Sequence, residues 1–534
     1  MNHSVSPSLR LSVSYPLQLH TIPPEDPAVY DMICHADTIG VFQIESRAQM
    51  SMLPRLKPQK FYDLVIEVAI VRPGPIQGDM VHPYLRRRNG EEKVSYPHPD
   101  VERVLGRTLG VPLFQEQAMS LAMVAAGFSA GEADALRRAM AAWKRKGDLI
   151  YRFGARLVEG MLARGYPRDF AERCFEQIKG FSEYGFPESH AASFALLVYV
   201  SAWLKKHHPA AFAAALINSQ PMGFYAPAQI VRDARDHGVE VRPVDVNCSR
   251  WDCTLEDAHN PWLAPSLRLG MRLVKGLHDE HARAIENAVR QRGVFDTIDA
   301  LHRAANVPIV ALRELAAADA FQSMGLDRQT ALWHVRALSD ERLPMFEEVA
   351  ITPGLKKEDS DCAETFSTVG SGSSSFVVRP GVKSARIALP PVSPPRKVID
   401  DYATLGLSLK AHPMSFVRER MNQRNVRRAI ELKDERHWPQ GRIISVAGVV
   451  LVRQRPGTAS GIMFMTIEDE TGIANLIIRP KVFERFRHAA RHGVIVVARG
   501  PVERQGEVIH VNVTRIDDAS DEMRMLLARS RDFH

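Results

Sequence analysis

The chain has 534 residues, of which 45% are hydrophobic and 25% are charged, a composition typical of globular proteins with several domains. This composition excludes a wholly disordered chain, a fibrous repeat and a small protein that depends on disulfides. Its 69 Lys and Arg residues outnumber the 62 acidic residues, and the net charge of +7 favours a polyanionic partner. None of the five cysteines is spaced as Cys-x-x-Cys, and no apolar run is long enough to cross a bilayer. We therefore expect a cytoplasmic protein without a membrane partner.

The chain over residues 22–225 is predicted to be mainly helical, after a polar tail over residues 1–21. Ser129 and Glu132 have the spacing of a capping box, which predicts a helix that begins directly after Ser129. Arg137 and Arg138 are adjacent on this helix, and Lys144 follows seven residues after Arg137. Paired guanidinium groups on a rigid helix suit phosphate oxygens, although a solvated charged face explains the same pattern.

Two further segments of this region contain glycine and proline beside candidate binding residues. Residues 71–88 form an irregular loop that ends in Arg86, Arg87 and Arg88, which suit a nucleic-acid backbone or form a surface cluster without a partner. Residues 179–212 form a turn followed by a long apolar helix. His190 lies at the start of that helix, and Tyr184 of the turn could stack on a base. The pattern alone favours the simpler interpretation, in which the aromatic residues belong to the core and His190 is a polar residue at the helix start.

Residues 226–343 are predicted to combine strands within 239–246 with helices over 279–290 and 310–318. Lys275 and Gly276 precede the first of these helices, where exposed backbone N–H groups can bind a DNA phosphate; a simple turn is the alternative. The Ser/Gly/Pro-rich stretch over 344–397 is expected to be a flexible linker.

After a helical segment over 398–434, residues 435–520 contain five strand-like runs separated by turn signals, and residues 521–534 form a second tail. A helical insertion over 479–491 lies between the third and fourth strand-like runs. This pattern predicts a five-stranded closed barrel of the OB type. The expected fold class is therefore multidomain α+β.

Seven motifs along the chain carry a resemblance to a known family. They are VFQIESRAQM (41–50), RPGPIQ (72–77), LFQEQAM (113–119), ADALRRAM (133–140), YGFPESHAASFALL (184–197), VDVNCS (244–249) and LGLSLKAHP (405–413). In this order they resemble the C-family bacterial DNA polymerases, that is, the alpha subunit of DNA polymerase III and its relatives. The variants GPIQGDMVHPYLRRR and YGFPESHAASFALLVY are most similar to the error-prone branch.

The resemblance implies a fingers domain over 22–225, with at most an edge of the palm before residue 72. Arg137 and Arg138 match the arginines that meet the triphosphate of the incoming nucleotide, and Tyr184 and His190 match the turn beside that pocket. Residues 226–343 are similar to a helix-hairpin-helix region that binds duplex DNA, and residues 435–520 to an OB domain that binds single-stranded template. The DNA-binding residues expected from the motifs and the resemblance are Arg86, Arg87, Arg88, Lys144, Lys275, Gly276, Arg453, Arg455, Phe464, Arg499 and Arg504.

The sequence departs from the family in its carboxylates. Members carry three catalytic aspartates in a palm domain, and no equivalent cluster is found; Asp63 is a single candidate. Asp359 and Asp361 lie in the linker, and the acidic run 468–470 lies at a hairpin turn, so neither predicts a metal site. We expect no metal ligand in this chain and Mg²⁺ only in the complete polymerase.

The expected function is part of an error-prone DNA-directed DNA polymerase acting in damage-induced synthesis, without catalysis by this chain alone. Its expected ligands are primer–template DNA and deoxynucleoside triphosphates, with a sliding clamp reached through accessory proteins. Two alternatives stay open. One is a non-catalytic module for DNA binding or assembly, and the other is a fragment of the replicative alpha subunit.

Overall fold

The computed structural model describes residues 17–72, 81–141, 147–180, 186–221, 225–257, 265–338, 390–455, 461–505 and 508–522. The chain forms two compact units. Unit 1 comprises Met1–Pro243, Cys253–Leu269 and Gly406–His534, and unit 2 comprises Val244–Asp252 and Gly270–Leu405. In the part of the chain that is described, no helix is long and apolar enough to cross a membrane.

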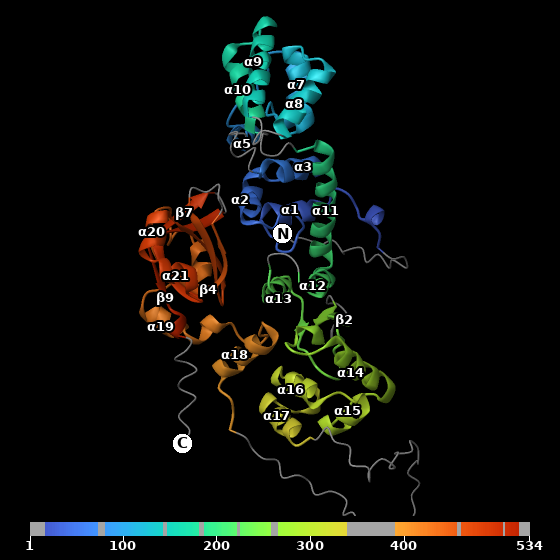
Figure 1. Cartoon of the computed structure of the whole chain (residues 1–534). Helices are drawn as coiled ribbons and strands as arrows, with labels where there is room; N and C mark the ends of the chain where they lie inside the picture. Colours follow the sequence, from blue (N-terminus) through green and yellow to red (C-terminus); the bar gives the residue numbers. More distant parts are fainter. Residues whose placement is uncertain are drawn as a thin grey trace, which may run out of the picture. The chain divides into compact units, whose positions relative to one another are not determined.

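The first part of unit 1 is helical, as expected (Figure 1). Its helices are α1 (Pro27–Cys34), α2 (Arg47–Leu56), α3 (Phe61–Ile70), α5 (Val81–Arg88), α6 (Pro99–Leu105), α7 (Gln115–Ala126), α8 (Ala130–Ala141), α9 (Gly147–Ala163), α10 (Arg168–Gly180), α11 (Glu188–His207), α12 (Pro209–Asn218) and α13 (Pro227–Asp236). Short 3₁₀ turns lie at Leu19–Thr21 and Gly106–Thr108. The long helix α11 packs against α3 and α1, which buries one face of each in a shared apolar core.

Helices α7, α8, α9 and α10 pack together as a small bundle (Figure 1). The predicted capping box begins α8: the Glu132 N–H donates to the Ser129 hydroxyl at 3.3 Å, and the Glu132 carboxylate accepts from the Ser129 N–H at 2.8 Å. Gly160 of α9 lies against the end of α7, where a Cβ atom would be 2.2 Å from the Ala126 carbonyl oxygen. A glycine is therefore required for the close approach of these two helices.

A small sheet follows α13 and is shorter than the sequence pattern suggested. It consists of β1 (Val241–Arg242), β2 (Thr254–Glu256) and β3 (Ser266–Arg268), with β3 in the middle. Alternation over 239–246 predicted a longer first strand. Pro243 ends β1 because proline has no N–H to donate to a neighbouring strand.

The second part of unit 1 is the predicted barrel, and its closure is confirmed. Its strands are β4 (Ile443–Gln454), β5 (Met463–Asp469), β6 (Gly472–Ile478), β7 (Ile495–Gln505), β8 (Val508–Val513) and β9 (Arg515–Asp518). The order β4-β5-β6-β8-β7, with β7 pairing back to β4, closes five strands, and β9 is added outside on β7. Helices α20 (Pro480–Arg485) and α21 (Arg487–His492) are the predicted insertion.

A helical segment covers one side of the barrel within unit 1. It contains the 3₁₀ turns η7 (Pro413–Phe416) and η8 (Ala429–Lys433) and helix α19 (Arg418–Gln423). Arg418 of α19 is buried, and its guanidinium donates to Asp469 at 2.9 Å and to Glu470 at 2.5 Å. Asp469 also accepts from the Ala429 N–H, so the acidic turn between β5 and β6 fixes this segment on the barrel.

Unit 2 is a separate helical body. Its helices are α14 (Asp279–Arg292), α15 (Ile298–Ala305), α16 (Ile309–Ala317), α17 (Arg328–Arg336) and α18 (Pro394–Leu405), with 3₁₀ turns at Met271–Leu273 and Gln322–Met324. Helix α14 packs against α15, and α16 packs against α17. Asn247 joins two turns of this unit, because its side-chain amide donates to the Phe295 carbonyl and the Ser323 hydroxyl. Of the predicted linker over 344–397, residues 344–389 lie outside the described residues, and its last four residues are the first turn of α18 and not a linker.

Candidate nucleotide and nucleic-acid sites

Helix α8 presents the two predicted triphosphate-binding arginines on its surface. The side chains of Arg137 and Arg138 are 43% and 67% exposed, and both guanidinium groups pair with Asp134, at 2.9 Å and 3.2 Å. Ala133 and Leu136 of the same helix are buried. Arg138 lies on the accessible side of α8, and Arg137, four residues after Ala133, lies at the edge of the buried face. Exposed ion pairs of this kind contribute about 0–1 kcal/mol, so a triphosphate can displace Asp134 from both arginines. Lys144 lies outside the described residues.

Three motifs that are far apart in the sequence converge at Phe186. The guanidinium carbon of Arg72 lies 3.5 Å from the centroid of the Phe186 ring, and the Phe186 carbonyl accepts from the Gln115 N–H at 3.1 Å. His190, at the start of α11, contacts the Phe186 ring with the ring centroids 5.1 Å apart. The RPGPIQ, LFQEQAM and YGFPESH motifs are therefore neighbours in space, which the sequence order alone did not show.

His190 itself is exposed, and its ring contacts two phenylalanine rings at an angle, one edge-on and one tilted. Its ring centroid is 4.3 Å from that of Phe194, one turn further along α11. Tyr184, the other residue predicted for this turn, lies outside the described residues. Among the described residues, no hydrogen bond, ion pair or ring contact joins His190 to the α8 arginines, so the structure does not bring the predicted nucleotide-binding residues into one contact group.

The three consecutive arginines lie in the last turn of helix α5, where an irregular loop was predicted, and they have different surroundings. Arg86 is half exposed and shares Glu92 with Arg87, with N–O distances of 2.9 Å and 2.8 Å. Arg88 is largely buried and donates to both carboxylate oxygens of Asp63 at 2.8 Å. Burial alone would raise the pKa of Asp63, but hydrogen bonds from Arg88 and from the Gln59 N–H lower it. Asp63 is therefore an internal ion-pair partner, and Arg88 is oriented toward the protein.

The Lys275–Gly276 turn precedes α14 in unit 2. Gly276 has a φ of +87°, a left-handed conformation that favours glycine, so this turn requires the residue that the sequence provides. The Lys275 ammonium donates to the carbonyls of Tyr402 and Ala403, at 3.2 Å and 2.9 Å, near the end of α18. Lys275 thus stabilises the carboxyl end of a helix in the free chain.

The predicted barrel cations are also unequal in their accessibility. Arg453 donates to the carbonyls of Ala490 and Gly493, and Arg504 donates to those of Leu432 and Trp438. Arg455 lies 4.9 Å from the ring centroid of Phe483. Two other predicted residues have side chains open to solvent. Arg499 is exposed on β7, and Phe464 is half-buried on β5.

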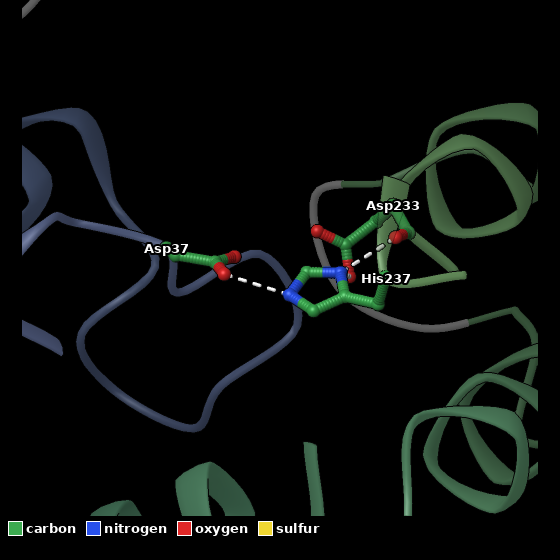
Figure 2. Close-up of side chains that lie close together, drawn as sticks. All are labelled: Asp37, Asp233 and His237. Carbon is green, nitrogen blue, oxygen red and sulfur yellow. Dashed lines mark hydrogen bonds and ion pairs between the residues drawn. The ribbon is translucent and has the colours of Figure 1, made fainter. Parts of the chain in front are cut away.

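One group of side chains has donor atoms close enough to be considered as a metal site. Asp37, Asp233 and His237 meet in unit 1, and the His237 Nε2 lies 2.7 Å from Asp37 (Figure 2). The buried Lys205 ammonium lies 2.8 Å from each of the two carboxylates. Burial alone would raise the pKa of Asp37, but the His237 hydrogen bond and the Lys205 charge lower it to about 2. Both carboxylates are therefore already paired with a cation of the chain, the Lys205 ammonium.

Sequence reasoning did not select Arg72 and Glu116 as site residues. Arg72 covers the Phe186 ring, and the Glu116 carboxylate accepts from the Glu188 N–H at 3.0 Å at the start of α11. Both residues belong to motifs that carry the family resemblance, and this membership was the one sequence feature that could have identified them. Their convergence depends on the packing of α7 against the start of α11, and no local pattern encodes that contact.

Three family models match successive parts of the chain. The bacterial DNA polymerase III alpha subunit finger domain matches residues 8–165, the helix-hairpin-helix motif matches residues 238–331, and the OB-fold nucleic acid binding domain matches residues 444–519. These matches confirm the expected fold class and the resemblance inferred from the motifs.

Curated relatives match nearly the whole chain. Error-prone DNA polymerase 1 of Agrobacterium fabrum is 52% identical over 525 residues, which are 96% of this chain and 45% of the relative. Error-prone DNA polymerase of Sinorhizobium medicae is 53% identical over 530 residues, 95% of this chain and 44% of the relative. Error-prone DNA polymerase of Mesorhizobium japonicum is 50% identical over 543 residues, which cover 98% of this chain and 45% of the relative. The chain therefore spans less than half the length of these relatives.

Proposed function

We propose that this chain is the nucleotide- and DNA-binding part of an error-prone DNA-directed DNA polymerase. The observation that carries this proposal is the alignment of 96% of the chain, at 52% identity, with a protein of that name. The finger, helix-hairpin-helix and OB-fold models match in the same order as the structural bodies described above. The names of these relatives favour the error-prone branch over the replicative alpha subunit.

In this proposal the incoming deoxynucleoside triphosphate is bound by α8 and by the start of α11. Arg137 and Arg138 exchange Asp134 for the phosphate oxygens, which each planar guanidinium group can bind with two hydrogen bonds. His190, together with Tyr184 of the preceding turn, is proposed to contact the nucleotide beside its triphosphate. The exposure of both arginines and the weakness of their existing ion pairs support this role.

Primer–template DNA is bound by the helix-hairpin-helix region and the barrel. The exposed cations Arg86 and Arg499 are available to phosphates, and Phe464 offers a ring for stacking. Arg87, Arg455 and Gly276 also remain in the proposed interface, as does Lys144. Six of these cations are engaged within the chain, so any DNA contact by them requires an exchange of partners: Arg87, Arg88, Lys275, Arg453, Arg455 and Arg504.

Nucleotidyl transfer uses Mg²⁺, which needs several oxygen ligands in octahedral geometry. Among the described residues, the Asp37–Asp233–His237 group has the donor atoms closest to this requirement, but the Lys205 ammonium lies between its carboxylates. These residues do not fit a magnesium ion. We therefore propose that the complete polymerase binds Mg²⁺ through carboxylates other than these, and that this chain alone does not join nucleotides.

The proposed cellular location, the cytoplasm, follows from the proposed DNA ligand. Bacterial chromosomal DNA lies in the cytoplasm, and a sliding clamp is reached through accessory proteins rather than through an element described in this chain. The other candidate function, a non-catalytic DNA-binding module, shares the same DNA-binding residues and differs in having no nucleotide site.

Primer extension tests the proposal. The isolated chain, mixed with labelled primer–template, four deoxynucleoside triphosphates and Mg²⁺, is expected to leave the primer unextended. It is also expected to bind the DNA with an affinity that falls by about tenfold or more between about 50 and 200 mM salt, because phosphate contacts release counterions. Sustained extension would refute the proposal that this chain alone does not join nucleotides. A binding constant insensitive to salt would refute the proposal that it binds DNA through phosphate contacts.

A further inference from the structure

Two arginines and a tryptophan lie together where the chain enters the barrel. The guanidinium carbons of Arg427 and Arg442 are 5.7 Å and 5.2 Å from the centroid of the Trp438 ring, within the range of cation–π contacts. The two guanidinium carbons are therefore within about 11 Å of each other. We call Arg427, Trp438 and Arg442 the Trp438 cluster. None of the three was expected to bind a ligand.

The barrel holds the backbone of this cluster in place. The Arg427 N–H donates to the Ser445 carbonyl of β4 at 2.8 Å, and the Val502 N–H of β7 donates to the Arg442 carbonyl at 2.9 Å. The Trp438 ring packs against the barrel core, and its carbonyl accepts from the Arg504 guanidinium at 2.9 Å. The two cations thus extend from fixed positions, which reduces the entropy lost when they bind a ligand.

The charges of the cluster are not compensated. Neighbouring arginines of the same segment pair with carboxylates: Arg418 with Asp469 and Glu470, Arg428 with Glu470, and Arg420 and Arg424 with Glu522. By contrast, Arg427 and Arg442 are exposed and have no carboxylate partner anywhere in the described ranges. A guanidinium that lies over an indole ring keeps its N–H groups available for an anion. The cluster therefore has two oriented cations with free hydrogen-bonding capacity.

A further exposed cation extends this surface along the barrel. Arg499 of β7 is the cross-strand partner of Ser445, the residue whose carbonyl binds the Arg427 backbone. Arg427 lies on one edge of β4 and Arg499 on the strand along its other edge, so the two exposed cations flank the start of β4. Phe464 lies on β5, opposite Gln454 and Ile477 of the neighbouring strands.

We infer that the Trp438 cluster binds the phosphates of single-stranded DNA, as a contact additional to the β5 surface of the barrel. The inference rests on the proposed function, because it takes DNA as the polyanion. Positive charge beside an aromatic platform is the combination that proteins use to bind single strands without sequence preference. Paired guanidinium groups suit phosphate oxygens, which can accept two hydrogen bonds from each.

The salt dependence of DNA binding by the full chain tests this inference. A fluorescent oligo-deoxythymidine is titrated at several salt concentrations, and the slope of log K against log salt counts the phosphates contacted, at about 0.7 per contact for a single strand. The Arg427→Gln/Arg442→Gln double variant is expected to have a slope shallower by about 1.4, and each single variant a slope shallower by about 0.7.

A paired arginine of the same segment gives the matched control. Arg420→Gln removes one arginine that is paired with the Glu522 carboxylate at 3.1 Å, so it is the control for each single variant, and its slope is expected to match that of the unmodified chain. Circular dichroism and thermal unfolding of each variant check that the barrel is folded. If the double variant does not fold, the single variants are used to test the inference. A double or single variant with an unchanged slope would overturn the inference while the unmodified chain still binds DNA. If the unmodified chain binds no DNA, the proposed function itself fails.

Discussion

Lys205 lies in the helical part of unit 1, and its charged side chain is almost completely buried, with 1% exposed. Its ammonium lies 2.8 Å from both Asp37 and Asp233 and 3.2 Å from the Ile39 carbonyl. A buried ion pair adds little net stability compared with apolar residues, but removing one partner leaves the others as uncompensated buried charges. Lys205 is therefore required for stability, because its charge compensates the carboxylates around it.

Replacing Lys205 by Met is expected to destabilise the chain by about 3–5 kcal/mol, because the largely buried Asp233 and the partly exposed Asp37 would lose the ammonium that pairs with both. Urea unfolding followed by far-UV circular dichroism measures the loss. The neighbouring Lys206 is exposed, so Lys206→Met is expected to stay within about 0.5 kcal/mol of the unmodified chain. Adding Asp233→Asn to Lys205→Met should recover part of the stability, and a Lys205→Met variant as stable as the unmodified chain would contradict this account.

Glu67 of α3 is a second buried acid, and neither carboxylate oxygen has a hydrogen-bond partner among the described residues. Burial raises its pKa well above the ordinary value, so the folded chain keeps the proton that the unfolded chain loses above about pH 4.3. The folded state then binds more protons than the unfolded state, and the free energy of unfolding falls as the pH rises above that value.

Glu67→Gln removes this titration and leaves a neutral side chain of similar size. We expect little change in stability near pH 4 and an increasing advantage for the variant as the pH rises to 8, measured by urea unfolding at each pH. The exposed Glu172, which pairs with Arg168 on α10, provides the control Glu172→Gln. An equal difference between Glu67→Gln and the unmodified chain at both pH values would show that Glu67 is ionised when folded.

At the scale of secondary-structure elements, the close packing of α9 against α7 depends on Gly160. A Cβ atom there would lie 2.2 Å from the Ala126 carbonyl oxygen and 3.0 Å from its carbonyl carbon, and backbone atoms cannot move aside cheaply. Gly160→Ala is expected to cost about 1–3 kcal/mol as the two helices separate. Gly131 of α8 has no atom within 4 Å of such a Cβ, so Gly131→Ala is expected to be neutral or to stabilise by up to about 1 kcal/mol. Equal thermal stabilities of the two variants would argue against close α7–α9 packing.

Local patterns predicted elements better than they predicted contacts. The Ser129–Glu132 pair gave the start of α8, and alternation with turn signals gave the barrel strands, because both signals depend on neighbours in sequence. The strand pattern over 239–246 failed beyond Arg242 because Pro243 interrupts pairing. The partners of long side chains depend on tertiary packing. For that reason no local pattern showed that Arg88 reaches Asp63 or that Arg504 binds the Trp438 carbonyl.

At the scale of the whole molecule, the proposed nucleotide and DNA sites lie on separate elements. Arg137 and Arg138 are on α8, whereas the proposed DNA contacts include the barrel and unit 2, and the motifs at Phe186 form a third group. The chain aligns with less than half the length of its error-prone polymerase relatives. The account therefore requires that the two kinds of ligand be separable by mutation.

Equilibrium binding of two fluorescent ligands to one double variant tests this requirement most directly. Arg137→Gln/Arg138→Gln is expected to weaken binding of a deoxynucleoside triphosphate by about a hundredfold, since hydrogen bonds to charged groups contribute about 1.5–3 kcal/mol each. Binding of primer–template should change by less than about threefold, because one or two phosphate contacts are a small part of the DNA interface. The control variant Arg168→Gln/Arg173→Gln removes two arginines of α10 that are also in exposed ion pairs, and it should bind both ligands normally. Equal losses for nucleotide and DNA, or unchanged nucleotide binding, would contradict the account.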